Sequence, residues 1–138
     1  MAQFTRTTPQ TLTQNQFIAF DATAVSGGCK VWKRTGSGLI SAAGSGCHCK
    51  PRIYRVIFHG NVVGAVGSIQ LAIFQDGVQL PETLMAVVPG GAADVWSVDA
   101  STEVRVDCNC STIGVALVSA NTVTANTASL IIKEVTTK

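Results

Sequence analysis

The sequence predicts an all-β protein that folds as an antiparallel sandwich or jelly roll. Short runs of apolar and β-branched residues recur along the whole chain, and Gly, Pro, Asn and Asp separate them. No segment of three helical turns shows the apolar spacing of an amphipathic helix. At 138 residues, with no linker or internal repeat, the chain is long enough for one domain with a real core.

The elements follow one another from a polar start. Residues 1–16 are rich in Thr and Gln, and they predict a polar N-terminal arm or an edge strand, because Pro9 cannot donate to a ladder. Residues 17–138 are expected to form the single jelly-roll domain. The predicted strands are Phe17–Phe20, Cys29–Arg34, Leu39–Ala43, Ile53–Val63, Ile69–Gln75, Val78–Leu80, Leu84–Val88, Ala93–Val98, Val104–Cys110, Ile113–Ser119 and Ser129–Val135.

Two of these predictions have a specific local cause. Ile53–Val63 has the highest strand propensity, since Ile, Tyr, Val and Phe dominate it. Asp76-Gly77 lies between two apolar runs, and this dipeptide is typical of the type I′ turn of a two-residue hairpin.

Composition narrows the classes of function. Charged residues make up 13% of the chain, about half the usual share, which suits a subunit that hides much of its surface in an assembly. A net charge of +2 does not indicate nucleic-acid binding. No apolar run has the roughly 18 residues of a membrane helix. Residues 1–10 lack the apolar core of a signal peptide, so we expect synthesis in a cytoplasm and release by lysis.

The order of several short motifs resembles a known fold family. A Gln-led opening, a Gly-Ser-Gly-hydrophobic segment, a Tyr-led strand, the Asp-Gly hairpin and an Ala-Ser-Leu strand follow one another. They are Gln10–Phe20, Gly36–Ile40, Tyr54–Phe58, Leu71–Pro81 and Ala128–Ile132. This order is similar to a C1q/TNF-like jelly roll, as in C-terminal domains of bacterial collagen-like spore-surface proteins and in small prophage structural proteins. The resemblance implies a compact homotrimer that acts as a tip, knob or decoration on a larger particle.

The chain departs from this family in two ways. It has no Gly-x-y collagen run, and it has five cysteines. We therefore expect a non-enzymatic structural protein of a phage or virion surface, as capsid decoration, head-fibre or tail knob, whose partners are capsid or tail proteins. Residues Ala2–Gln16 would dock it on the shell. One alternative is an adhesin-like knob that binds a receptor or a host surface glycan, with Trp96 and Trp32 as stacking residues. Another is a spore-surface knob.

In a trimer, one sheet of each subunit faces its neighbours, so the side chains on both faces of that sheet must tolerate burial. In Ile53–Val63, Tyr54 and Phe58 share one face, and Ile57 lies on the other. The last strand alternates in the same way, which indicates burial on both faces. An ordinary sandwich with a central strand is the alternative. The predicted trimer interface consists of Ile53, Arg55, Ile57, His59, Ile131 and Lys133. In a trimer, His59 could bind an ion or sense pH.

The cysteines allow three interpretations. Cys47-His48-Cys49 and Cys108-Asn109-Cys110 could each present two thiolates on one side of a strand, and together they could hold a structural Zn²⁺ with His48 as an alternative ligand. Disulfides between these segments, or involving Cys29, would need an oxidising environment. Free thiols, with the second pair in the core, are the third interpretation.

The remaining polar residues do not predict an enzyme or a cofactor. Asp76 belongs to the hairpin turn, where its role is conformational. Glu103 and Asp107 flank Arg105 on one strand face, which favours an ion-pair ladder over an acid/base pair. No Gly-rich loop precedes a helix, so no phosphate site is indicated.

Overall fold

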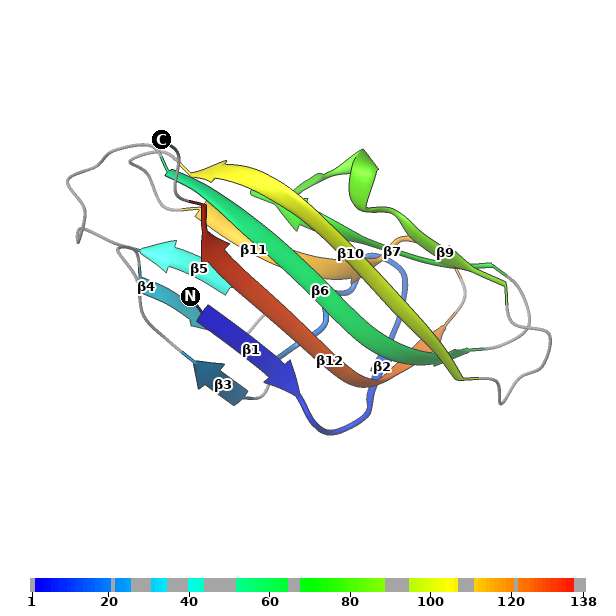
Figure 1. Cartoon of the computed structure of the whole chain (residues 1–138). Helices are drawn as coiled ribbons and strands as arrows, with labels where there is room; N and C mark the ends of the chain where they lie inside the picture. Colours follow the sequence, from blue (N-terminus) through cyan, green and yellow to red (C-terminus); the bar gives the residue numbers. More distant parts are fainter. Residues whose placement is uncertain are drawn as a thin grey trace.

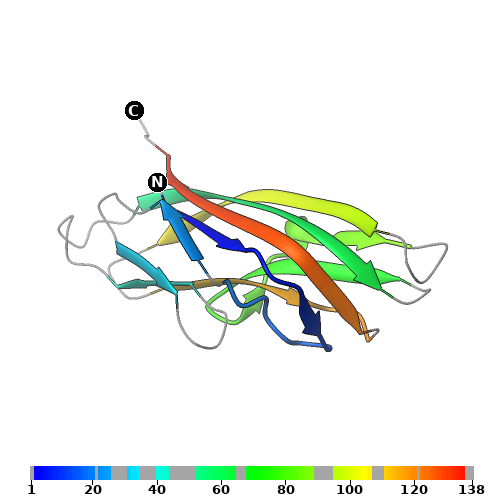
Figure 2. The same cartoon turned by 90° about the horizontal axis from the view of Figure 1, so that it is seen from below.

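Two antiparallel β-sheets pack face to face around one apolar core, which confirms the all-β sandwich (Figures 1 and 2). The structure is a computed structural model that describes residues 2–20, 22–25, 31–34, 40–43, 52–64, 68–88, 95–106, 111–120 and 122–135. It describes residues 2, 22–25, 31–34, 41–43 and 52 by their backbone alone. No helix within these ranges is long and apolar enough to span a membrane.

The front sheet, which faces the viewer in Figure 1, has the strand order β10-β6-β12-β1-β3 among the described residues, and β2 also pairs with β12. Its strands are β1 (Ala2–Arg6), β2 (Gln10–Leu12), β3 (Ala22–Val25), β6 (Arg52–Gly64), β10 (Val95–Val106) and β12 (Val123–Glu134).

The back sheet has the order β4-β5-β11-β7-β8 in the described part of the chain, and β9 also pairs with β7. Its strands are β4 (Val31–Arg34), β5 (Ile40–Ala43), β7 (Ile69–Gln75), β8 (Val78–Gln79), β9 (Met85–Val87) and β11 (Ser111–Leu117). The 3-10 turn η1 (Pro81–Thr83) connects β8 to β9. The bounds of β7 are those predicted.

The hairpin of β7 and β8 confirms the predicted type I′ turn. Asp76 has φ of 52° and Gly77 has φ of 82°, the positive values that this turn requires at both central residues. The Asp76 carboxylate also accepts hydrogen bonds from the Thr112 amide at 2.8 Å and from the Ser111 hydroxyl at 3.1 Å. Asp76 therefore fixes the turn against the start of β11.

Strand β12 occupies the middle of the front sheet. It pairs with β6 from Val123↔Gly64 to Glu134↔Tyr54, and its other edge pairs with β1 and β2. The register shifts between Ala125 and Thr127, so the buried residues change from odd numbers before the shift to even numbers after it. The predicted Ser129–Val135 covers only the part after this bulge.

The core lies between the inner faces of the two sheets. Phe4 and Phe58 from the front sheet are fully buried, and so are Leu71 and Ile113 from the back sheet. Gly60 lies beside Phe58 on the inner face of β6, where an added Cβ would come within 2.8 Å of the Phe58 ring. A glycine at position 60 thus makes room for the aromatic ring of Phe58 in the core.

Strand β10 corrects one prediction. Ala93–Val98 and Val104–Cys110 were expected as separate strands, but Val95–Val106 is continuous and pairs with β6 along its whole length. The polar stretch between them alternates: Ala100 and Thr102 face inward and are half-buried, and their neighbours are exposed. The long partner strand therefore keeps this stretch extended, despite its turn-like composition.

The polar arm over residues 1–16 is also corrected, because β1 and β2 belong to the front sheet. Strand β1 lies between β12 and β3, so it is not an edge strand, and Phe4 and Leu12 are fully buried. The polar side chains of this segment bond to backbone nearby. Arg6 Nη1 donates to the Ala19 carbonyl at 2.6 Å, and Gln10 Oε1 accepts from the Ala19 amide at 2.8 Å. Pro9 lies between the two strands, outside either ladder.

The predicted strand Phe17–Phe20 is reduced to a single bridge. Phe17 pairs with Ala116 of β11, and the Ile18 amide donates to the Val115 carbonyl at 2.8 Å. The side chains of Arg6 and Gln10 also form hydrogen bonds with the backbone of this segment. Ile18 is therefore held in the core although the segment forms no regular strand.

The inclusion of β1 in the core generates a stability prediction. We expect Phe4→Ala to lower the free energy of unfolding by about 3 to 5 kcal/mol, because it removes a fully buried aromatic ring. Thr11→Ala on the neighbouring strand changes an exposed side chain and is the matched control, with little expected change. Urea denaturation followed by circular dichroism measures both values. Equal, small losses would contradict the placement of residues 2–12 in the sandwich.

Candidate functional site

The outer face of the front sheet is the candidate site, because polar and apolar side chains meet there in register. Strand alternation that buries Tyr54, Val56 and Phe58 turns the intervening residues of β6 outward. We call the outward set the outer front face; its described members include Gln3, Thr5, Ile53, Arg55, Ile57, His59, Asn61, Val63, Val95, Ser97, Asp99, Ser101, Glu103, Arg105, Thr127, Ser129, Ile131 and Lys133.

Two isoleucines lie side by side at the centre of this face. Ile57 on β6 and Ile131 on β12 are Cα partners, and both are half-buried. Their outer neighbours in the same row are polar: Ser101 is opposite Ile57, and Gln3 is opposite Ile131. The row therefore has an apolar middle with a polar neighbour on each side, and beyond Gln3 it continues to Val25 of β3.

A charged row lies next to the isoleucines. Arg55 has Glu103 as its Cα partner on one side and Lys133 on the other. Arg55 Nη2 and Glu103 Oε1 are 3.0 Å apart, and their side chains are 53% and 48% exposed. A pair this exposed adds little to monomer stability. A hollow lined by Arg55, Lys133, Glu134 and Val135 opens at this end of the face.

Uncharged polar groups and a histidine occupy the other side of the isoleucine row. His59 is exposed, with Asp99 as its Cα partner on β10 and Ser129 on β12. In the next row, the Ser97 hydroxyl donates to Asn61 Oδ1 at 2.9 Å, and Asn61 Nδ2 donates to Thr127 Oγ1 at 3.0 Å. These bonds orient three side chains of three strands along the face.

The outer face of the back sheet is different, because aromatic rings cover part of it. Phe17 and Phe74 meet edge to face with ring centroids 5.5 Å apart. Phe74 is the Cα partner of Gly114, and Phe17 forms a bridge to Ala116; both small residues are buried. This part of the back sheet is thus closed within the chain, whereas the isoleucine row of the front sheet is half open.

The structure brings the six predicted interface residues to one face. Ile53, Arg55, Ile57 and His59 alternate along β6, and Ile131 and Lys133 are next to them on β12. Sequence reasoning missed the contributions of β1 and β10, because β1 was assigned to an arm and β10 was divided. The alternation of polar Gln3, buried Phe4 and polar Thr5 was the available signal for β1.

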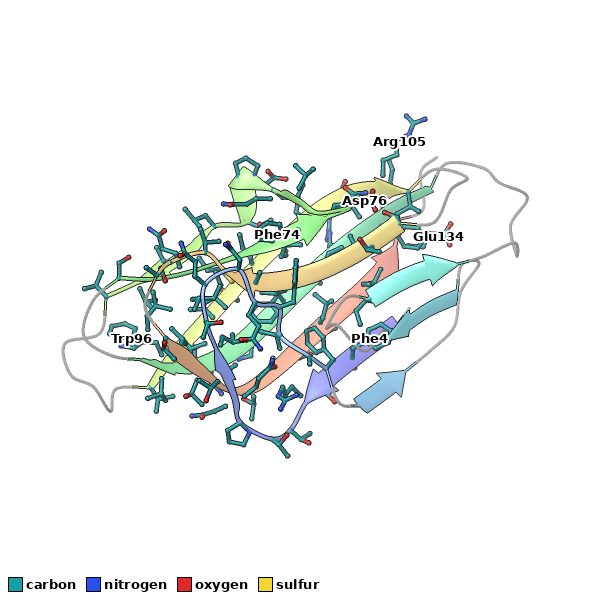
Figure 3. All side chains as sticks on the ribbon, turned by 180° about the vertical axis from the view of Figure 1, so that it is seen from behind. Phe4, Phe74, Asp76, Trp96, Arg105 and Glu134 are labelled. Carbon is teal, nitrogen blue, oxygen red and sulfur yellow. The ribbon has the colours of Figure 1, made fainter. Side chains whose placement is uncertain are left out.

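The two predicted stacking residues lie far from this centre. Trp96 begins β10 and is 38% exposed, next to Val95, which is 61% exposed. Figure 3 shows Trp96 at one end of the sandwich, opposite the end that carries Asp76, Arg105 and Glu134. Trp32 lies in β4 as the Cα partner of Ala42, but its side chain lies outside the described residues.

All predicted metal and disulfide residues lie outside the described residues: Cys29, Cys47, His48, Cys49, Cys108 and Cys110. The strands that flank the two Cys-x-Cys segments are described. Arg52 is the Cα partner of Val106, and Ala42 is the Cα partner of Ser111. One segment connects β5 to β6, and the other connects β10 to β11. Because β6 pairs with β10 and β5 pairs with β11, the strand ends that flank the two segments are Cα partners. Free thiols, disulfides and a zinc site stay as alternative predictions.

The described carboxylates are dispersed over the sandwich. Asp76 holds the β7–β8 turn, Glu103 pairs with Arg55, and Glu82 Oε1 accepts a hydrogen bond from the Thr102 hydroxyl at 3.0 Å. Across the described ranges, no three His, Cys, Asp or Glu side chains form a group that could hold a metal ion. Asp107 of the predicted ion-pair ladder lies outside these ranges.

Comparison with solved structures confirms the predicted fold family. The globular domain of zebrafish complement 1qA matches with a TM-score of 0.65 and 11% identity, over 94% of this chain and 94% of that one. The Eiger TNF of S. frugiperda matches with a TM-score of 0.70 and 10% identity, over 99% of this chain and 93% of that one. No family model and no curated protein matches the sequence. The chain thus has the C1q/TNF-like jelly-roll fold.

Proposed function

We propose that this chain is a non-enzymatic structural subunit that assembles as a homotrimer through its outer front face and decorates the surface of a phage or virion. The observation that carries the proposal is the row of Ile57 and Ile131, two half-buried isoleucines at the centre of a sheet face with polar ends. A closed ring of identical subunits is a common way to cover such a face.

The composition of the outer front face supports assembly between copies of the chain. Protein interfaces have an apolar centre and a polar rim, and the isoleucine row with its serine, glutamine and charged neighbours has this pattern. The Arg55–Glu103 pair lies at the rim, where it would guide the register of the subunits more than their affinity. The resemblance to C1q/TNF-like jelly rolls supports three as the number of subunits.

The particle role is supported by the sequence resemblance to small prophage structural proteins and by the low content of charged residues. A content of 13% suits a subunit that is surrounded by copies and by capsid or tail proteins. Phe4 and Leu12 belong to the core, so any docking by Ala2–Gln16 would use the exposed residues of this segment, such as Thr7, Thr8 and Gln14.

Assembly is tested by the native mass and by one charge placed in the isoleucine row. We expect light scattering after size-exclusion chromatography to give three times 14.3 kDa for the natural chain. Ile57→Asp should give a monomer, because a carboxylate would be desolvated in the interface. Val78→Asp is the matched control: it replaces a 65% exposed valine on the back sheet and should keep the trimer.

A monomer at every concentration for the natural chain would contradict the trimer. Loss of the trimer in both variants would place the interface elsewhere or indicate general damage to the fold, which circular dichroism distinguishes.

The particle role is tested by fractionation of the cells that produce the protein. We expect the tagged chain to band with phage-like particles in a density gradient after lysis and to appear on their surface by immunogold labelling. A chain found only in the soluble fraction would contradict the role on a virion. A chain found on spores would favour the spore-surface alternative.

The exposed end of β10 favours a second candidate function, a knob that binds a host surface glycan. Trp96 is 38% exposed and Val95 is 61% exposed, so an indole face is open to solvent at one end of the sandwich. Aromatic side chains with open faces suit stacking against the apolar faces of sugar rings. Trp96 lies at one end of the sandwich, away from the isoleucine row, so binding and assembly could occur together.

The glycan candidate predicts that Trp96→Ala abolishes binding to cells or to a glycan array, while the native mass and the circular dichroism spectrum stay unchanged. Trp96→Phe should keep part of the binding, because it keeps an aromatic face. Binding that is absent in the natural chain, or equal in the natural chain and in Trp96→Ala, would exclude Trp96 as a stacking residue.

A further inference from the structure

We propose that His59 makes the assembly sensitive to acid, so that protonation of its imidazole separates the subunits. This inference rests on the proposed homotrimer and adds a mode of regulation to the same face. An imidazole is the side chain whose charge ordinarily changes between pH 5 and 8. The chain has two histidines: His59 lies on the outer front face, and His48 lies outside the described residues.

The position of His59 couples its charge to assembly. It is two residues from Ile57 on β6, and its Cα partner on β12 is Ser129, two residues from Ile131. His59 is exposed in the single chain. Packing of another subunit over the isoleucine row would therefore cover the imidazole or its immediate surroundings. A neutral imidazole tolerates this loss of water, and an imidazolium does not unless a counter-ion accompanies it.

The charged groups near His59 decide the direction of the effect. From β10, Asp99 faces it directly, and Glu103 and Arg105 lie further along the strand. Its own strand contributes Arg55, and β12 contributes Lys133 and Glu134. The face residues of β1 are the uncharged Gln3 and Thr5. Because Glu103 is bonded to Arg55, Asp99 is the carboxylate in register with an imidazolium at position 59.

Asp99 would offset only part of the cost of burying a charged His59. Asp99 is exposed on the last described strand of the sheet, and a pair between exposed side chains contributes little. Removing an ion from water costs more than such a pair returns. Arg55 and Lys133 lie on the other side of the isoleucine row from His59, so these cations change the cost little. Protonation thus opposes assembly.

The direction of the pH effect follows from the cost of burying a charged His59 in the interface. The free chain binds a proton at His59 more readily than the trimer does, so a fall in pH shifts the equilibrium toward free chains. Assembly therefore weakens as the pH falls from 8 to 5.

The experiment is sedimentation equilibrium of the natural chain at pH 8, 7, 6 and 5, with circular dichroism of each sample. We expect trimer at pH 8 and a progressive shift to folded monomer below pH 6.5. His59→Gln, which keeps a neutral polar side chain, should stay trimeric down to pH 5.

The outcomes separate this inference from the proposal on which it rests. A natural chain that is monomeric at pH 8 would contradict the homotrimer itself. A trimer that persists at pH 5, or a dissociation that His59→Gln shares, would overturn the role of His59. An assembly that becomes tighter in acid, and loses this effect in Asp99→Asn, would reverse the sign and show that the pair of His59 and Asp99 dominates.

Discussion

The position of β12 in the middle of the front sheet is the constraint on which the rest of the structure depends. This strand pairs with β6 from the middle of the chain and with β1 from its start, so Ala2 is the Cα partner of Ile132. Its even-numbered residues after the bulge, Leu130 and Ile132 among them, are buried in the core. The pairing of β12 with β1 joins segments more than a hundred residues apart, so this part of the front sheet forms only when both segments are present.

Strand β12 also determines which side chains lie on the outer front face. With Leu130 and Ile132 directed inward, Ile131 must point outward, and the register with β6 places it beside Ile57. The apolar row on the outer front face is therefore a consequence of the register that builds the core. A shift of one residue would bury Ile131 and expose Leu130 and Ile132, so the core and the candidate interface are determined together.

The outer faces of the two sheets differ in the side chains that cover them. On the back sheet, Phe17 and Phe74 pack over Gly114 and Ala116, and the chain covers its own surface. On the front sheet, the corresponding positions carry isoleucines, hydroxyls, charges and one histidine, with hydrogen bonds that run along the face, as in Ser97–Asn61–Thr127. This asymmetry connects the fold to the proposed assembly, and it places His59 where its charge would matter most for contact with another subunit.

The sequence by itself determined the class of fold and most of the strands. High strand propensity in Ile53–Val63 predicted β6, and Asp76-Gly77 predicted the hairpin, because both signals are local. The six interface residues followed from the side-chain alternation on β6 and β12.

Only the tertiary structure decided which strands are partners. Residues 2–12 read as a polar arm, yet β12 offers them a ladder, and Phe4 and Leu12 fill the core. The stretch between Val98 and Val104 reads as a turn, yet pairing with β6 keeps it extended. The bulge at Ala125/Thr127 changes the phase of β12, which hid its first half from the alternation pattern. In each case the stabilising partner is distant in the sequence, so the local pattern alone did not decide the pairing.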